Sequence, residues 1–91
     1  MSLRRRLEEL EELPPGCDFL DVDLLLRGCG YECYDDGVTL LYSHEKWRSI
    51  WTFPRSRRSI PASRLLEIIA FVRWHLEREG RLDQEYPKNA H

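Results

Sequence analysis

The spacing of the apolar residues changes twice along this chain of 91 residues, and this limits the folds that it can adopt. Before Gly30 and after Pro61 the apolar residues recur at helical spacing. Between these points they come in short runs rich in aromatic and β-branched residues, which is typical of strands. The order helix, strands, helix predicts an α+β fold. A chain of this length builds one hydrophobic core, so we expect a single domain.

Three strands are expected in the middle of the chain, at residues 31–34, 38–42 and 47–53. The Asp-Asp-Gly sequence at 35–37 is of the kind that favours a tight hairpin. The polar residues 43–46 are expected to form the second turn. Consecutive strands joined by short turns predict a three-stranded antiparallel meander.

The clearest helix is expected after the strands, from Pro61 to about Glu79. Proline is tolerated in the first turn of a helix, and the glycine at position 80 suits its end. Five apolar residues recur along this segment at helical spacing: Leu65, Ile68, Ile69, Val72 and Leu76.

Two shorter helices are expected before the strands. The first covers residues 3–13 and is stopped by two consecutive prolines. The second begins at Asp18 or Asp21, where a carboxylate can cap free amides, and ends at Gly28 or Gly30. The residues expected to be buried are Leu3, Leu7 and Leu10 in the first helix and Leu20, Val22, Leu24 and Leu25 in the second.

These elements suggest three segments. Residues 1–16 are expected to form an N-terminal helical extension, 17–80 the α+β domain, and 81–91 a polar tail that lies loose or docks weakly. No window approaches the roughly 20 apolar residues of a membrane span, and no apolar signal core follows the first arginines. We therefore expect a cytoplasmic protein with no membrane partner.

Neither a cofactor nor a metal site is expected. Cys29 and Cys33 have no histidine nearby in the chain, which makes a poor zinc site, and reduced thiols are the simpler interpretation. Asp35 and Asp36 are explained by the turn in which they lie, without a bound cation.

The charges are divided unevenly along the chain. Residues 1–45 contain four basic and eleven acidic side chains, a net charge of −7, whereas residues 46–91 contain ten basic and five acidic ones, a net charge of +5. Residues 46–64 contain no acid at all, so this stretch is either a solvated face or a docking site for phosphate. Its basic residues are Lys46, Arg48, Arg55, Arg57, Arg58 and Arg64.

Three arginines within four residues, Arg55, Arg57 and Arg58, have no acid nearby in the chain with which to pair. They need a distant acidic surface or an anion, and the guanidinium group suits phosphate oxygens. The helix expected to begin at Pro61 presents unpaired amides to the same place. We therefore expect the six basic residues of this stretch to bind the phosphates of RNA.

The third strand has an aromatic face. Trp47, Trp51 and Phe53 lie on one side of it, and Arg48, Ile50 and Thr52 lie on the other. If the helices cover the aromatic side, these residues belong to the core. If that side faces solvent, they can stack on the bases of single-stranded RNA. The sequence leaves both arrangements open.

About half of the chain resembles the HicA toxin family of small mRNA interferases, which share the fold of double-stranded RNA-binding domains. The resemblance rests on Leu24-Leu25, Gly30-Tyr31, Gly37, the strand end Trp51-Thr-Phe-Pro54, the basic loop after it, and the pair Leu65 and Ile68. It implies a dsRBD-like fold, an RNA partner, an antitoxin protein as second partner, and endoribonuclease activity.

The family's Gly-Ser-His motif on the second strand, whose histidine is taken to be catalytic, is replaced here by Gly37-Val38-Thr39. The pair Ser43-His44 follows a few residues later. His44 is therefore the candidate catalytic residue, because an imidazole can shuttle a proton between a 2′-hydroxyl and a leaving group at neutral pH without a metal. Otherwise His44 is a solvated turn residue.

An alternative function requires no RNA. The acidic first half of the chain can neutralise the arginines, within one molecule or in a neighbouring copy. The protein is then a non-catalytic interaction subunit that forms a homo-oligomer through the leucines of residues 3–13 and through its oppositely charged faces.

Overall fold

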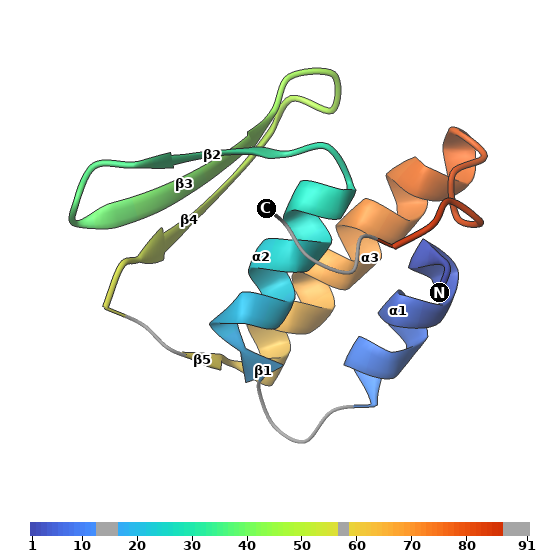
Figure 1. Cartoon of the computed structure of the whole chain (residues 1–91), viewed down its shortest axis with the longest axis horizontal. Helices are drawn as coiled ribbons and strands as arrows, with labels where there is room; N and C mark the ends of the chain where they lie inside the picture. The colour runs from blue at the N-terminus through green and yellow to red at the C-terminus, as the bar shows by residue number, and fades with distance from the viewer. Residues whose placement is uncertain (13–16, 57–58, 87–91) are drawn as a thin grey trace.

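The computed structural model describes residues 1–12, 17–56 and 59–86 of the chain. It confirms the α+β class, with a three-stranded antiparallel sheet, two helices packed on it and a further helix at the N-terminus (Figure 1). The helices are α1 (Leu3–Glu11), α2 (Phe19–Gly28) and α3 (Ala62–Arg78). The strands are β1 (Cys17–Asp18), β2 (Glu32–Asp35), β3 (Thr39–His44), β4 (Ser49–Pro54) and β5 (Ser59–Ile60).

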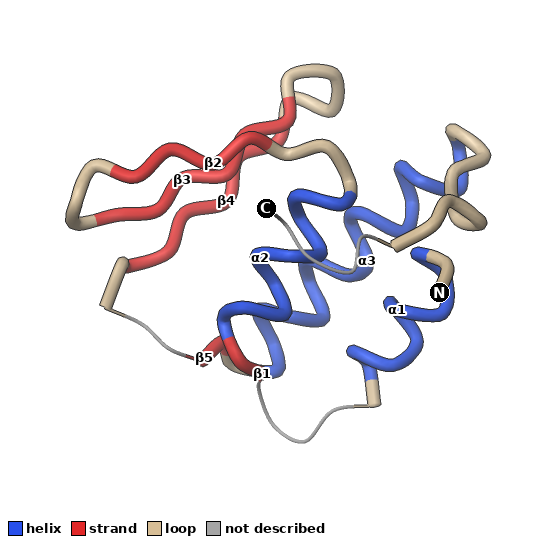
Figure 2. The backbone as a smooth tube through the Cα atoms, in the orientation of Figure 1, coloured by secondary structure: helices blue, strands red, loops and turns tan. Residues whose placement is uncertain are grey.

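The predicted meander is confirmed, with the strand order β2-β3-β4 (Figure 2). The side chain of Asp36 closes the first turn, because it accepts hydrogen bonds from the amides of Val38 and Thr39 at 2.8 and 2.7 Å. A separate ribbon of β1 and β5 joins the segments that lead into α2 and α3.

The second turn differs from the prediction. The structure extends β3 to His44 and begins β4 only at Ser49, so that Trp47 lies in the turn rather than in a strand. Arg48 has a φ angle of 50°, and its amide donates to the carbonyl of Glu45 at 3.2 Å. A left-handed residue cannot continue an extended strand, so the turn ends there.

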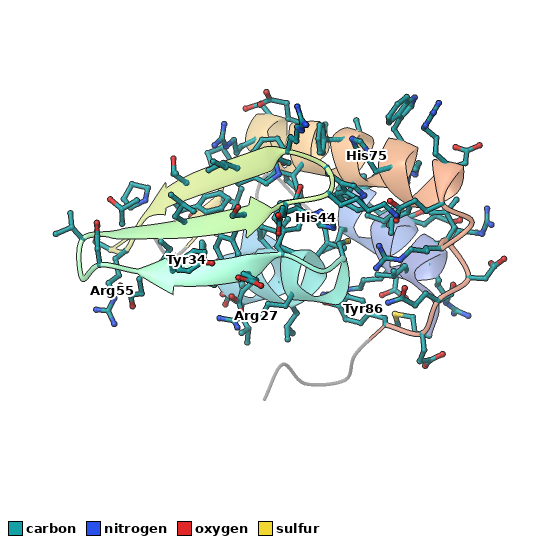
Figure 3. The ribbon with its side chains drawn as sticks, turned by 90° about the horizontal axis from the view of Figure 1, so that it is seen from above. Arg27, Tyr34, His44, Arg55, His75 and Tyr86 are labelled. Carbon is teal, nitrogen blue, oxygen red and sulfur yellow. The ribbon has the colours of Figure 1, made fainter. Side chains whose placement is uncertain are left out.

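One face of the sheet packs on α2 and α3, and none of the described elements covers the other (Figures 1 and 3). On the covered face, Phe19 of α2 lies against Phe53 with ring centroids 5.3 Å apart, and Phe71 of α3 lies 5.8 Å from Trp51. The aromatic side of β4 is therefore part of the core. On the uncovered face, Ile50 is 62% exposed.

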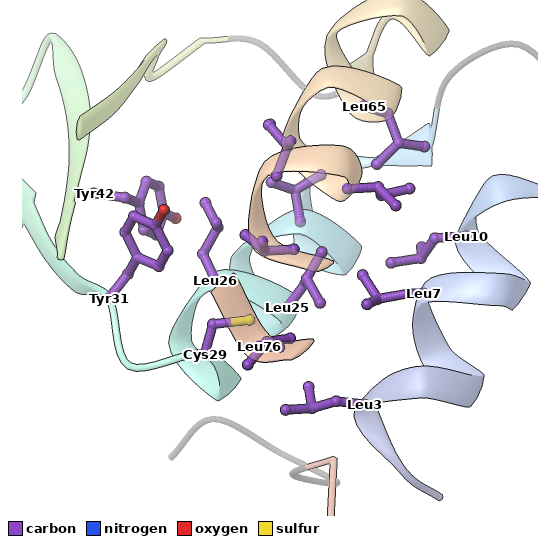
Figure 4. Close-up of a cluster of buried hydrophobic side chains, with 14 of the residues drawn as sticks. Leu3, Leu7, Leu10, Leu25, Leu26, Cys29, Tyr31, Tyr42, Leu65 and Leu76 are labelled. Carbon is purple, nitrogen blue, oxygen red and sulfur yellow. The ribbon is translucent and has the colours of Figure 1, made fainter. Parts of the chain in front are cut away.

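The helices bury the apolar stripes that periodicity predicts in α1 and α3, whereas two of the four residues expected in α2 differ: Leu24 is only partly buried and Leu20 is exposed. All five expected residues of α3 are buried, as are the three leucines of α1 (Figure 4). In α2 the buried stripe runs through Val22, Leu25 and Leu26, whereas Leu20 is 58% exposed. The expectation for Leu20 is wrong because it lies about 200° around the helix from Val22.

The burial of the α1 leucines bears on the interaction-subunit alternative. Leu3, Leu7 and Leu10 are at most 1% exposed within a single chain and face the other helices (Figure 4). They are therefore not available as an oligomer contact while α1 stays packed.

Of the two arrangements expected for the C-terminal segment, loose or docked, residues 81–86 adopt the docked one. Leu82 and Tyr86 are buried, and the backbone of this segment pairs with the start of α1. The amides of Leu3 and Arg4 each donate at 2.8 Å to carbonyls of this segment. The first amides of a helix lack partners within it, so the segment caps α1. Residues 87–91 lie outside the described residues.

We predict that Leu7→Ala lowers the free energy of unfolding by about 2–4 kcal/mol, because it leaves a cavity between packed helices. The matched control is Leu66→Ala on α3, where the leucine is half exposed and the expected loss is under about 0.5 kcal/mol. Urea denaturation followed by circular dichroism measures both. Equal losses for the two variants would contradict the role of α1 in the core.

Candidate functional site

The predicted phosphate-binding residues do not form one cluster. Lys46 and Arg48 lie in the turn between β3 and β4, whereas Arg55 follows the other end of β4. A six-residue strand separates these two ends by roughly 20 Å, at about 3.3 Å per residue. Arg64 lies in the first turn of α3. Arg57 and Arg58 lie outside the described residues.

Two of these cations have acidic partners that are distant in sequence. Lys46 Nζ lies 3.2 Å from Glu79, and Arg55 Nε lies 3.0 Å from Asp35. For Arg55 this is the distant acidic partner that the sequence leaves open as the alternative to an anion, and Lys46 has such a partner as well. Both side chains remain more than half exposed, and exposed pairs stabilise a protein by only about 0–1 kcal/mol, so an anion can compete for them.

The other two described cations have no carboxylate partner within the described residues. Arg48 projects from the turn as an exposed side chain. The guanidinium of Arg64 lies over the rings of Trp51 and Phe53, with its carbon 5.1 and 5.7 Å from their centroids. These cation–π contacts hold the Arg64 group at the junction between β4 and α3.

The start of α3 lies at the same junction. Its N-cap residue is Pro61, which makes no side-chain cap, and its first turn contains no acidic residue. The first amides of the helix therefore have no side-chain acceptor within the described residues. Unpaired amides and the positive end of the helix dipole favour an anion at this position.

His44 occupies a different environment from the predicted solvated turn. It is the last residue of β3 and only 8% exposed. Its Nδ1 accepts a hydrogen bond from the Trp47 amide at 3.2 Å, so Nδ1 carries no proton. Its Nε2 must then carry the proton and donate to the carbonyl of Cys29, also at 3.2 Å. Both ring nitrogens are engaged in a neutral imidazole.

The surroundings of His44 favour the neutral imidazole and hold its ring in place. Burial lowers the pKa of the imidazole, partly offset by the hydrogen bond to Cys29. Gly30 has a φ of +104°, and a Cβ at this position would lie 3.2 Å from His44 Nε2. The geometry is that of a structural histidine, with no ring nitrogen left for a substrate.

Trp47 is held between two histidines, an arrangement that we call the histidine–tryptophan stack (His44, Trp47 and His75). The rings of His44 and Trp47 are 3.9 Å apart and 8° from parallel. His75 of α3 stacks on the other side at 4.8 Å and 17°. His75 carries no motif that marks it as part of a site, although its spacing of four residues from Glu79 puts both on one face of α3.

Glu79 links this stack to the end of α3. Its carboxylate accepts the indole N–H of Trp47 at 2.8 Å and a guanidinium N–H of Arg81 at 3.0 Å, and it pairs with Lys46. The hydrogen bond from Trp47, followed by that from Arg81, lowers the pKa of Glu79 to about 2. The carboxylate is therefore ionised at neutral pH.

A polar cleft of about 670 Å³ opens beside His44. Acidic and basic side chains share its lining, and Tyr34 donates its hydroxyl proton to Glu32 at 2.7 Å. Burial raises the pKa of the thiol of Cys29, whose backbone carbonyl accepts from His44, to about 12, so this thiol stays protonated at neutral pH. The lining residues are Gly30, Glu32, Tyr34, Ser43, His44, Glu45 and Lys46.

The described residues hold no group of three or more histidine, cysteine, aspartate or glutamate side chains placed to bind a metal ion. None of the described helices combines the length and apolar character needed to cross a bilayer.

Comparisons of the chain with protein-family models, curated proteins and solved structures find no match. The resemblance to HicA toxins and the dsRBD-like label therefore stay predictions that rest on the residues given above.

We predict that acid weakens the fold through Glu79. The folded-state pKa of about 2 lies below the ordinary value of 4.5, so its contribution to stability is present above pH 4.5 and is lost as the pH falls toward 2. Glu79→Gln should reduce the loss of stability between pH 5 and pH 2.5. The control is Glu77→Gln, an exposed carboxylate on the same helix. Urea denaturation across this pH range measures the free energy of unfolding of each variant. The same dependence on pH for the two variants would contradict the role of Glu79.

We also predict that Gly30→Ala costs more stability than Gly37→Ala. Both glycines have positive φ angles, for which an alanine costs about 1–3 kcal/mol of strain. A Cβ at position 37 meets nothing within 4 Å, whereas one at position 30 crowds His44 and disturbs its hydrogen bond to Cys29. We expect Gly30→Ala to lower the free energy of unfolding by about 1 kcal/mol more than Gly37→Ala, as measured by urea denaturation. Equal costs would show that His44 does not need this space.

Proposed function

We propose that this protein binds single-stranded RNA through the junction between β4 and the start of α3. The observation that carries the proposal is the guanidinium of Arg64, which lies over Trp51 and Phe53 beside helix amides with no side-chain cap. Phe53 is buried and Trp51 packs on Phe71, so these rings hold the guanidinium in place, and the flat guanidinium itself meets a phosphate or stacks on an unpaired base.

The surrounding charges support the same proposal. Arg55 lies at the end of β4, and residues 57 and 58 in the following segment are arginines by sequence. The exposed pair of Arg55 with Asp35 contributes little to stability, so a phosphate can replace the carboxylate at small cost. A basic strand end followed by an uncapped helix start provides donors for more than one phosphate.

The specific form of this proposal is a HicA-like module, the toxin of a toxin–antitoxin pair with an antitoxin protein as its second partner. A small neighbouring reading frame that encodes a DNA-binding domain would support it. We confine the proposal to binding, because both ring nitrogens of His44 are already engaged. If the protein cleaves RNA and His44→Ala, still folded, loses that cleavage, the proposal must be extended to catalysis.

We predict that Arg64→Ala weakens binding of a fluorescein-labelled ten-nucleotide oligouridylate by about tenfold at 50 mM salt, measured by fluorescence anisotropy. The control is Arg78→Ala, because the guanidinium of Arg78 lies over Trp74 at 4.6 Å near the other end of the same helix. Binding by this control should stay within about twofold of the unmodified protein.

Salt dependence gives a second measurement in the same assay. The slope of log affinity against log salt should fall by about 0.7 for each phosphate contact removed. The triple alanine variant of Arg55, Arg57 and Arg58 should therefore show both weaker binding and a shallower slope. Unchanged binding by the triple variant, or equal losses for Arg64→Ala and Arg78→Ala, would refute the proposal.

A further inference from the structure

The free edge of β4 presents unpaired backbone groups. The Arg55 amide donates to the carbonyl of Val38 at 2.9 Å, which identifies this opposed pair as hydrogen-bonded. In an antiparallel ladder such pairs alternate with pairs that are not hydrogen-bonded. The register of β3 and β4 therefore turns the amides and carbonyls of Ile50 and Thr52 away from β3. They have no hydrogen-bond partner within the described residues.

This edge lacks the charges that normally protect an outer strand. Proteins prevent the pairing of exposed edges with charged side chains, bulges or covering segments. The other outer strand, β2, carries Glu32 and Asp35. All six residues of β4 are uncharged. Only Pro54, at the end of the strand, restricts pairing with another strand, because proline has no amide hydrogen to donate. Ile50 and Thr52 add exposed side chains on the uncovered face beside their free backbone groups.

Arginines lie at both ends of this edge. Arg48 precedes β4 without an acidic partner in the described part of the chain, and Arg55 follows it with an exposed pair to Asp35. A second copy paired antiparallel on this edge would bring Arg48 of one chain near Arg55 of the other, and like charges across strands are unfavourable. An extended segment with an acidic residue at each end would instead place a negative charge beside each of the two arginines.

We propose that β4 is the docking edge for an extended segment of a protein partner, β-branched in its middle and acidic at both ends, which adds to the sheet as a fourth strand. The backbone groups of Ile50 and Thr52 supply hydrogen bonds, and the two flanking arginines select the charge of the partner. The two proposals share Arg55 but rest on different main groups, because this one uses the free backbone edge of β4 and the RNA proposal uses the guanidinium of Arg64.

The test uses a synthetic peptide, acetyl-EVTVTVTE-amide labelled with fluorescein, and fluorescence anisotropy. Thr52→Pro removes the outward amide and leaves the ladder to β3 intact, because proline is tolerated at an edge where the amide faces solvent. We expect it to weaken peptide binding by at least about tenfold. Thr52→Ala keeps the amide and should bind within about twofold.

Hydrogen exchange by NMR supplies a readout that does not depend on any substitution. The amides of Ile50 and Thr52 should exchange rapidly in the free protein and become protected when the peptide is bound. Arg48→Ala should weaken peptide binding about threefold at low salt, and a peptide with lysine in place of both glutamates should bind at least about tenfold more weakly.

Several outcomes would overturn the proposal. These are equal peptide binding by Thr52→Pro and Thr52→Ala, unprotected amides at saturation, or a lysine peptide that binds as well as the acidic one. A concentration-dependent dimer that Thr52→Pro abolishes would assign the edge to a second copy instead. Protection of these amides by oligouridylate but not by the peptide would assign the edge to RNA. Arg64→Ala should leave peptide binding unchanged, so failure here is distinguishable from failure of the RNA proposal.

Discussion

The position of the sheet on the helices depends on the placement of Trp47. Its indole is stacked between His44 and His75, and its N–H donates to Glu79 at the end of α3. This one side chain connects the β3–β4 turn, the end of β3 and the last turn of α3. At the other end of the sheet, Phe19 packs against Phe53. Between them, these contacts determine where β4 lies and therefore which of its groups reach solvent.

Much of the fold could be predicted from the sequence, because it depends on local patterns. Residue spacing predicts the buried apolar stripe of α3 and the buried leucines of α1, and turn chemistry predicts the turn at Asp36. All three are confirmed. The errors concern tertiary partners. Leu20 is apolar but lies on the side of α2 away from the core. The sequence leaves open whether residues 81–86 are loose or docked, and in the structure they dock on the start of α1. Neither relation is visible in a local window.

The candidate site could be predicted less well, because ion pairs and stacks join residues that are distant in sequence. Asp35 meets Arg55 across the sheet, and Glu79 meets Lys46 from α3. A count of charges along residues 46–64 cannot reveal these partners. His44 was identified as a residue of interest by its chemistry, but its two hydrogen bonds depend on the Trp47 amide and on the carbonyl of Cys29, which only the folded chain brings together.

Neighbouring surfaces of the protein have different tasks. The histidine–tryptophan stack holds the sheet, the junction at Arg64 is proposed to bind RNA, and the free edge of β4 is proposed to bind a partner segment.

The most direct test of the RNA proposal is a titration of ¹⁵N-labelled protein with oligouridylate, followed by NMR. We expect the largest shifts at the Nε–H of Arg64 and at the amides of residues 62–64, with α1 unaffected. Shifts confined to α1, or none at saturating RNA, would contradict the account.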